Sequence, residues 1–196
     1  MSINELKIYL DLSLESKTKV LDKYAKKFYF SGYFFVDSDD GHCYLFNRRG
    51  KEKDVSMIHE ITEDIIPKDI KKIVIPNSVM NIRYAAFYNC TNLTSVTIPD
   101  SVTSIGNFAF ADCRRLTSMT IPDSVTSIGG WAFENCGGLT DVKIPDNVVN
   151  IERYTFYYCN NLKSLVFKNK TINQVKSMKY YPFGIKDKSI IKAELS

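Results

Sequence analysis

SVTSIGNFAFADCRRLTSMTIPDSVTSIGGWAFENCGGLT, residues 101–140, decides the fold of this chain because it contains nearly the same segment twice. Equivalent residues are 23 positions apart, and the same spacing continues on both sides. A fixed period in the twenties is the signature of a solenoid, in which each repeat buries its apolar edge against the next. The residues that keep the period are Pro76, Pro99, Pro122 and Pro145; Phe87, Phe110, Phe133 and Phe156; Cys90, Cys113, Cys136 and Cys159; and Leu93, Leu116, Leu139 and Leu162.

Each repeat contains one segment that favours a β-strand. The segment from Leu93 to Ile98 alternates apolar and polar residues, and the proline after it stops the pairing of a β-ladder. The stretch from Ala109 to Cys113 is too short for more than one or two helical turns. A partial unit precedes the complete ones, because Ile70, Ile73 and Ile75 match Leu93, Val96 and Ile98. Complete units begin at Ile75, Ile98, Ile121 and Ile144.

These units resemble the BspA-like (type 5) leucine-rich repeat family, whose motif runs IPxSVTSIGxxAFxxCxxLTSV. Residues 101–140 match that motif almost position for position, and the resemblance covers roughly residues 70–167. It implies an α/β fold, a short leucine-rich-repeat solenoid with a parallel sheet on the concave face and short helical turns on the convex face. The family is associated with surface attachment and protein–protein contact, so the resemblance implies a binding role.

The solenoid is expected to occupy residues 67–167 and to be closed at its N-terminal end by an α+β cap, residues 1–66. Helices are expected in the first 28 residues, and residues 54–66 are expected to form a helix or an irregular leader. Between them, aromatic residues in 28–35 and the segment 43–46 favour two strands of a hairpin.

The C-terminal cap is expected in residues 168–196. Thr171 and Gln174 form a capping-box pair that predicts a short helix. Ser189 to Leu195 is expected to be a closing strand, because an uncapped last repeat exposes an apolar face and an open sheet edge.

The recurring apolar residues are predicted to form the core, since no repeat can bury its apolar edge alone. The four recurring cysteines invite a disulfide or zinc interpretation. Zinc sites need paired short spacings such as Cys-x-x-Cys, which are absent, and the fifth cysteine, Cys43, is out of register. We therefore predict a buried, reduced row of cysteines, no metal site and no cofactor.

The outward positions of the strands form the first candidate partner-binding surface. Their centre is shallow and nearly neutral, with Asp141 and Lys143 as its charges, and it lacks aromatic anchors. About five strands would give a sheet of roughly 20–25 Å. The candidate residues on this face are Ser95, Ser118 and Asp141 in one row and Thr97, Thr120 and Lys143 in the next.

The second candidate surface is a row of aromatic residues. Phe108, Trp131 and Tyr154 occupy one repeat position, and the first unit has Ala85 there with Tyr84 beside it. We interpret the row as a shield over the convex core. The alternative is a stripe that contacts a partner, since Trp and Tyr dominate interface energetics.

Composition argues against the other function classes. Hydrophobic content of 44% and charged content of 24% are ordinary for a globular protein. Only His42 and His59 are available for catalysis, and no nucleophile elbow, HExxH motif or phosphate-binding glycine loop occurs. Arg114, Arg115 and the basic C-terminal segment offer phosphate contacts, but a net charge of +4 does not make a basic groove.

We therefore expect a non-enzymatic protein-interaction module, acting as an adaptor, effector or attachment component. The alternative is a structural component or spacer of a larger assembly, such as a phage particle or a cell surface. Charges interrupt Met1 to Lys19, so no apolar signal core is seen, and no apolar stretch is long enough to span a membrane. These features predict a cytoplasmic location, with surface or virion association as the alternative.

Overall fold

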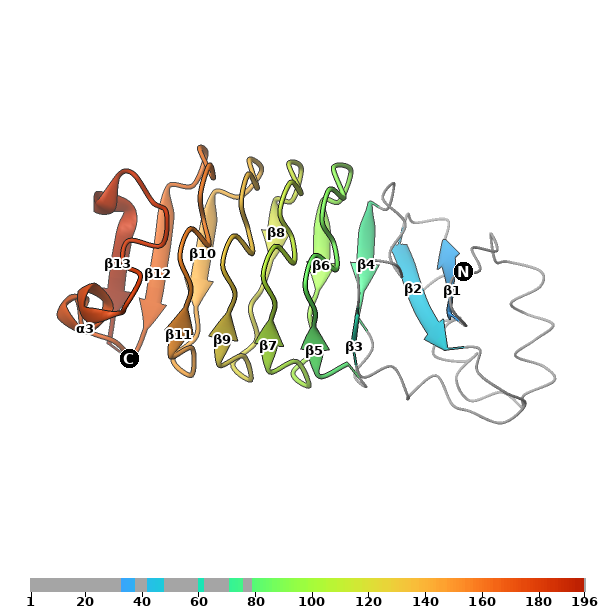
Figure 1. The fold of residues 1–196 in the computed structure, drawn as a ribbon, viewed down its shortest axis with the longest axis horizontal. Coiled ribbons are helices and arrows are strands. Elements are labelled where there is room, and N and C mark those ends of the chain that lie inside the picture. The colour runs from blue at the N-terminus through green and yellow to red at the C-terminus, as the bar shows by residue number, and fades with distance from the viewer. Residues whose placement is uncertain (1–32, 38–41, 48–59, 62–70, 76–78, 196) are drawn as a thin grey trace.

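The computed structural model describes residues 33–37, 42–47, 60–61, 71–75 and 79–195. Its repeats stack along one axis, and each full repeat contributes two short strands to two separate parallel ladders (Figure 1). The strands run parallel because each repeat returns to the same starting point 23 residues later. The predicted solenoid is therefore confirmed.

The first ladder contains the strands that the Leu93–Ile98 pattern predicts. Strands β4 (Lys72–Val74), β6 (Ser95–Thr97) and β8 (Ser118–Met119) pair in parallel, and so do β10 (Asp141–Ile144), β12 (Ser164–Lys168) and β13 (Ile191–Glu194). Equivalent residues lie opposite each other, as Lys72, Ser95 and Ser118 do. The two groups belong to separate sheets, so the single sheet expected across all repeats is divided between β8 and β10.

The second ladder was not predicted. It consists of the two-residue strands β3 (Glu60–Ile61), β5 (Asn81–Ile82), β7 (Ser104–Ile105), β9 (Ser127–Ile128) and β11 (Asn150–Ile151). Each of the strands β5, β7, β9 and β11 places one isoleucine in the core, and these residues are Ile82, Ile105, Ile128 and Ile151. The second ladder therefore makes each repeat a flattened coil with strands on two sides.

Hydrogen-bonded turns fill the segment expected to form short helical turns, and they do not extend into helices. They stack through a third ladder of backbone hydrogen bonds, in which the N–H of one repeat donates to a carbonyl 22 residues later. Phe110 N donates to Ala132 O at 2.8 Å, and Phe133 N donates to Thr155 O at 2.9 Å. Backbone polar groups are thereby satisfied on this side too.

The core is a set of continuous residue ladders, as predicted. Phe87, Phe110, Phe133 and Phe156 stack with ring centroids 4.8 to 5.5 Å apart and nearly parallel planes. The recurring leucines and isoleucines are also buried. Thr155 is a fully buried polar residue, and its hydroxyl donates to the carbonyls of Gly129 and Glu152, so its burial is compensated.

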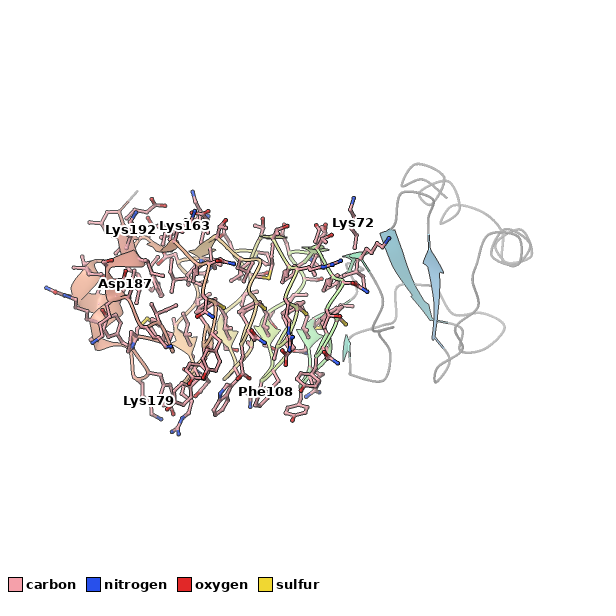
Figure 2. The ribbon with its side chains drawn as sticks, turned by 90° about the horizontal axis from the view of Figure 1, so that it is seen from above. Lys72, Phe108, Lys163, Lys179, Asp187 and Lys192 are labelled. Carbon is pink, nitrogen blue, oxygen red and sulfur yellow. The ribbon has the colours of Figure 1, made fainter. Side chains whose placement is uncertain are left out.

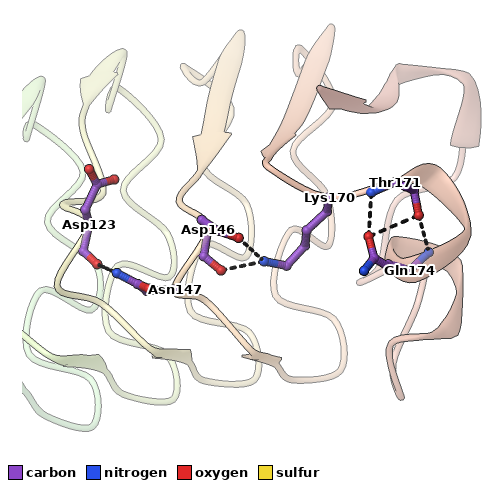
Figure 3. Close-up of polar contacts among 6 residues, drawn as sticks. All are labelled: Asp123, Asp146, Asn147, Lys170, Thr171 and Gln174. Atoms are coloured by element: carbon purple, nitrogen blue, oxygen red, sulfur yellow. Dashed lines mark hydrogen bonds and ion pairs between the residues drawn. The ribbon is translucent and has the colours of Figure 1, made fainter. Parts of the chain in front are cut away.

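The C-terminal cap is built as predicted, from helix α3 (Ile172–Ser177) and strand β13. Thr171 and Gln174 form the predicted capping box. Lys170 precedes the helix at the repeat position of Asn147. Asn147 binds the carbonyl of Asp123, and Lys170 binds the carbonyl and carboxylate of Asp146 (Figure 3). The cap therefore continues a row of polar side-chain contacts between neighbouring repeats.

A second part of the cap extends the turn ladder. Phe156 N donates to Phe183 O at 3.0 Å, so residues near Phe183 take the place of a further repeat. Gly184 has φ +89°, and a Cβ there would lie 3.0 Å from the Cα of Tyr154 and the N of Tyr157. Glycine thus allows the cap backbone to reach the last repeat.

Strands β1 (Tyr33–Asp37) and β2 (His42–Asn47) confirm the predicted hairpin. They pair antiparallel, and β2 pairs in parallel with β4, so the hairpin continues the first ladder at its N-terminal end. Residues 60–61, expected to belong to a helix or an irregular leader, form strand β3. The helices predicted in the first 28 residues lie outside the described residues.

Candidate binding surface

The predicted aromatic row is part of a longer series of stacked rings on the turn side. Phe108 and Trp131 stack at 5.2 Å between centroids with an interplanar angle of 1°. Trp131 and Tyr154 follow at 5.3 Å, and the series continues to Tyr84 at one end and Tyr157 at the other. We call Tyr84, Phe108, Trp131, Tyr154 and Tyr157 the aromatic comb.

The comb lies at the surface. Tyr84 is 62% exposed and Tyr154 is 45% exposed, whereas Phe108 and Trp131 are half-buried between their neighbours. Figure 2 shows Phe108 on the side of the solenoid opposite Lys72, Lys163 and Lys192. The rings touch each other along the solenoid axis, so they present their edges and hydroxyl groups to solvent.

The backbone beneath the comb is in an unfavourable conformation. Phe108, Trp131 and Tyr154 have φ of 57°, 54° and 58°, in the left-handed region. Bulky residues there carry a cost of about 1–3 kcal/mol each, which ring stacking of about 0.5–1.5 kcal/mol per pair partly offsets. The other left-handed position of these repeats holds Asn89, Asp112 and Asn135, residue types that tolerate that region, and Tyr158 in the last repeat. Aromatic side chains thus occupy a position where smaller polar residues would be less strained.

Cationic side chains surround the C-terminal end of the comb. The Lys179 ammonium lies 4.8 Å from the ring centroid of Tyr180, and the Arg153 guanidinium lies 5.4 Å from it. The Lys186 ammonium lies 5.5 Å from the ring of Tyr158. We call Arg153, Lys179 and Lys186 the basic end. Hydrogen bonds from Lys179 and Arg153 lower the pKa of the Tyr180 phenol, so two positive charges converge on one hydroxyl group.

The predicted strand-face surface is also present. Thr97, Thr120, Asp141 and Lys143 are exposed, and Ser95 is half-exposed. Lys192 of β13 extends their second row, because it lies opposite Val166 as Val166 lies opposite Lys143. The structure places Ser118 in β8 opposite Ser95 and describes only its backbone. The side chains that the structure describes on this face are small polar groups and scattered charges, and none of them is aromatic.

The four recurring cysteines lie in the core, as predicted. All four are buried, and none of them is in a disulfide bond. The thiols of Cys113, Cys136 and Cys159 donate to the carbonyls of Phe87, Phe110 and Phe133. Burial raises the pKa of Cys159 to about 12, and it raises the pKa of Cys136 strongly. These thiols are structural hydrogen-bond donors.

We expect the recurring cysteines to resist thiol reagents in the folded protein. A pKa of about 12 for Cys159 lowers its thiolate fraction roughly a thousandfold relative to an ordinary thiol. A Cys43→Ser variant should therefore show no reaction with Ellman's reagent at pH 8 until urea unfolds it. Fast reaction of the folded protein would contradict this placement.

The same pKa shift makes stability depend on alkaline pH. The folded-state pKa of Cys159 lies above the unfolded value, so its contribution to stability is complete below about pH 9. That contribution is lost as the pH rises toward 12. Urea unfolding midpoints should fall over this range, and the fall should be smaller in a Cys159→Ala variant measured against its own value at pH 8.

Arg114 and Arg115, singled out from the sequence as possible phosphate contacts, each contact a polar side chain of this chain. Arg114 forms an ion pair with Asp112 at 3.0 Å, and Arg115 donates to Asn92. His59 lies outside the described residues. Among the residues that the structure describes, no group of three or more His, Cys, Asp or Glu side chains is arranged to hold a metal. No helix in that part of the chain is long and apolar enough to cross a bilayer.

Family comparison agrees with the stacked architecture. The BspA type leucine rich repeat region matches residues 67–186 in six copies. The chain belongs to the BspA-type leucine-rich repeat family. The matched BspA-type region extends past residue 167 into the segment predicted as the C-terminal cap, where Phe183 continues the turn ladder. Proteins with leucine-rich repeats are generally interaction modules without enzymatic activity.

Solved structures show the same BspA-type fold. The T. pallidum leucine rich repeat protein TpLRR is 21% identical, with a TM-score of 0.60 over 86% of this chain and 81% of that one. A leucine-rich repeat protein from Bacteroides ovatus is 21% identical, with a TM-score of 0.51 over 85% of this chain. The pneumococcal vaccine antigen PcpA is 20% identical, with a TM-score of 0.53 over 82% of this chain.

The chain spans 52% of the length of the Bacteroides ovatus protein and 34% of the length of PcpA. Curated protein sequences give no match. The comparisons therefore establish the fold and the BspA-type family.

Sequence reasoning found the centre of the comb, with Tyr84 beside the same position of the first unit, and missed its C-terminal end. Tyr157, Tyr180 and the basic end were not predicted as site residues. The repeat position of Tyr157 shows no continuous aromatic row, because Ala111 and Glu134 stand between Tyr88 and Tyr157. Lys179 and Lys186 lie in the cap and follow no repeat period. The sequence signals near them are the capping box at Thr171, which predicts a helix start, and the turn residues Tyr181-Pro182-Phe183-Gly184.

Proposed function

We propose that this chain is a non-catalytic protein-binding module, acting as an adaptor, effector or attachment component, and that the aromatic comb is its contact surface. The observation that carries the proposal is the presence of surface aromatic residues at three strained, left-handed positions, with Tyr154 exposed and Phe108 and Trp131 half-buried. A shield over the core does not need them, because the rings of Phe110, Phe133 and Phe156 already fill the core beneath. Exposed Trp and Tyr side chains are the residues that most often dominate protein interfaces.

The strand face is the competing surface. It has room for a partner, but its Ser and Thr side chains supply little apolar area, and truncating such residues seldom weakens binding. The comb instead offers a continuous apolar ridge that a partner would desolvate. We therefore assign the main contact to the comb and a lesser role to the strand face.

The test is a pull-down from the native source with wild type and two variants. The comb variant is Phe108→Asn, Trp131→Asn and Tyr154→Asn, since asparagine tolerates the left-handed region and should preserve the backbone. The strand-face variant is Asp141→Asn with Lys143→Gln. Circular dichroism should show that all three proteins are folded.

We expect wild type and the strand-face variant to retain the same partner and the comb variant to lose it, with at least about a tenfold fall in affinity. Recovery of no partner by wild type would remove the main support for a binding module. Loss of the partner by the strand-face variant alone would move the contact to the strand face.

A further inference from the structure

The stacking of the comb limits what it can bind. Sugars and nucleic-acid bases bind aromatic residues through the exposed faces of the rings. At the centre of the comb neighbouring rings cover these faces, since Phe108 and Trp131 lie parallel at 5.2 Å and Tyr154 follows at 5.3 Å with a tilt of 33°. At the two ends, Tyr84 and Tyr157 meet their neighbours edge to face. What remains for a ligand is a ridge of ring edges and hydroxyl groups, roughly 15 Å long over three repeat steps. Such a ridge fits the side chains of an extended protein segment of about four residues.

The ridge is also asymmetric in charge. Arg153, Lys179 and Lys186 lie at its C-terminal end, and within the described part of the chain none of them forms an ion pair. Figure 2 shows Lys179 on the same side of the solenoid as Phe108. Their contacts are with the rings of Tyr180 and Tyr158, which hold the cations in place without neutralising them.

Two carboxylates near this end accept hydrogen bonds from other groups. Glu152 accepts one from Asn150 at 3.1 Å, and its charge also acts on Lys179 without forming an ion pair with it. Asp187 accepts one from the backbone N–H of Ser189 at 2.9 Å, in the turn that leads to β13. The basic end is therefore positioned to receive carboxylates from outside the chain.

We infer that the comb binds an extended segment of a partner protein in one orientation, with apolar side chains along the ring edges and Asp or Glu side chains at Arg153, Lys179 and Lys186. This inference rests on the proposed function and specifies the chemistry of the partner. The C-terminal cap then contributes to recognition, because it supplies Lys179 and Lys186, two of the three cations. The cap backbone lies against Tyr154 of the comb at Gly184.

The test is selection of a displayed library of random 12-residue peptides on the immobilised full chain. Three variants are compared with wild type: the comb variant, a charge-reversed variant (Arg153→Glu, Lys179→Glu and Lys186→Glu), and a control with the same change of charge on the opposite side (Lys143→Glu, Lys163→Glu and Lys192→Glu). Selected peptides are synthesised, labelled and titrated. Trp131, the single tryptophan of the chain, reports contact with the comb through its fluorescence.

We expect wild type to select peptides in which an apolar run is followed or preceded, consistently on one side, by Asp or Glu. These peptides should bind the charge-reversed variant about tenfold more weakly and the control variant equally well. The charge-reversed variant should in turn select Lys- or Arg-containing peptides. Added salt should weaken binding to wild type.

Two outcomes separate this inference from the proposed function. Peptides that need the comb but show no preference for acidic residues would overturn the inference and leave the binding module intact. Failure to select any peptide that depends on the comb would overturn both. Binding of a single-stranded oligonucleotide with the same dependence on the comb would also overturn the inference, since it would show that ring faces are accessible.

Discussion

Replacing Phe133 with alanine is expected to lower the free energy of unfolding by about 3–5 kcal/mol. Its side chain has 0% exposure and lies between the rings of Phe110 and Phe156, at 5.4 and 5.5 Å. The cavity left behind cannot close, because the backbone hydrogen bond from Phe133 to Thr155 and those of the neighbouring repeats hold the repeat spacing. Equilibrium unfolding in urea, followed by circular dichroism, measures the loss.

Two controls make this result specific to the buried stack. Phe133→Leu keeps most of the apolar volume and should cost less than half as much. Tyr84→Ala removes a ring that is 62% exposed and should change stability by about 1 kcal/mol or less. Equal losses for Phe133→Ala and Tyr84→Ala would contradict the assignment of the inner stack as the core.

Replacing Gly129 with alanine is expected to destabilise the protein by about 3 kcal/mol, at the upper end of the usual cost of overpacking. A Cβ at Gly129 would lie 2.5 Å from the backbone N of Asn107 and 2.5 Å from the C of Gly106. Both are backbone atoms of the preceding repeat, so relief requires the two repeats to separate. The hydrogen bond from Gly130 N to the Asn107 side chain would be disturbed as well.

Gly137 provides a matched control in the same repeat. A Cβ at Gly137 meets only the carbonyl of Arg114, at an ordinary 3.7 Å. Gly137→Ala should therefore be neutral, or stabilising by about 0.5 kcal/mol through the reduced entropy of the unfolded chain. Coincident urea midpoints for the two variants would show that the close approach at Gly129 is not a constraint on stacking.

The sequence predicts the core residues of this molecule well, because every repeat must bury an apolar side chain at the same position. Phe110 and Leu116 recur in register for the same physical reason, and the structure buries both rows completely. Thr171 and Gln174 were predictable for a local reason, since a capping box needs only residues three positions apart. The hairpin at β1 and β2 also follows from local composition.

The parts that escaped prediction depend on geometry that no residue pattern encodes. Ser104–Ile105 is too short to show an alternating pattern, so the second ladder is invisible until the repeats are stacked. The position of Trp131 in the sequence does not reveal its left-handed φ, which aligns its ring with that of Phe108. Lys179 reaches the comb only because the cap folds back beside Arg153 and Tyr180.

The identity of two neighbouring repeat segments affects how the length of this solenoid can evolve. Residues 98–106 and 121–129 are the same nine amino acids, IPDSVTSIG, one period apart. Removal or duplication of 23 residues between them would rejoin identical segments and keep the register in which the strands of neighbouring repeats pair. The comb would become shorter or longer by one ring while its two ends stayed the same. Unequal recombination can therefore change the length of the aromatic comb by one repeat at a time, while neighbouring repeats keep the same kind of core packing.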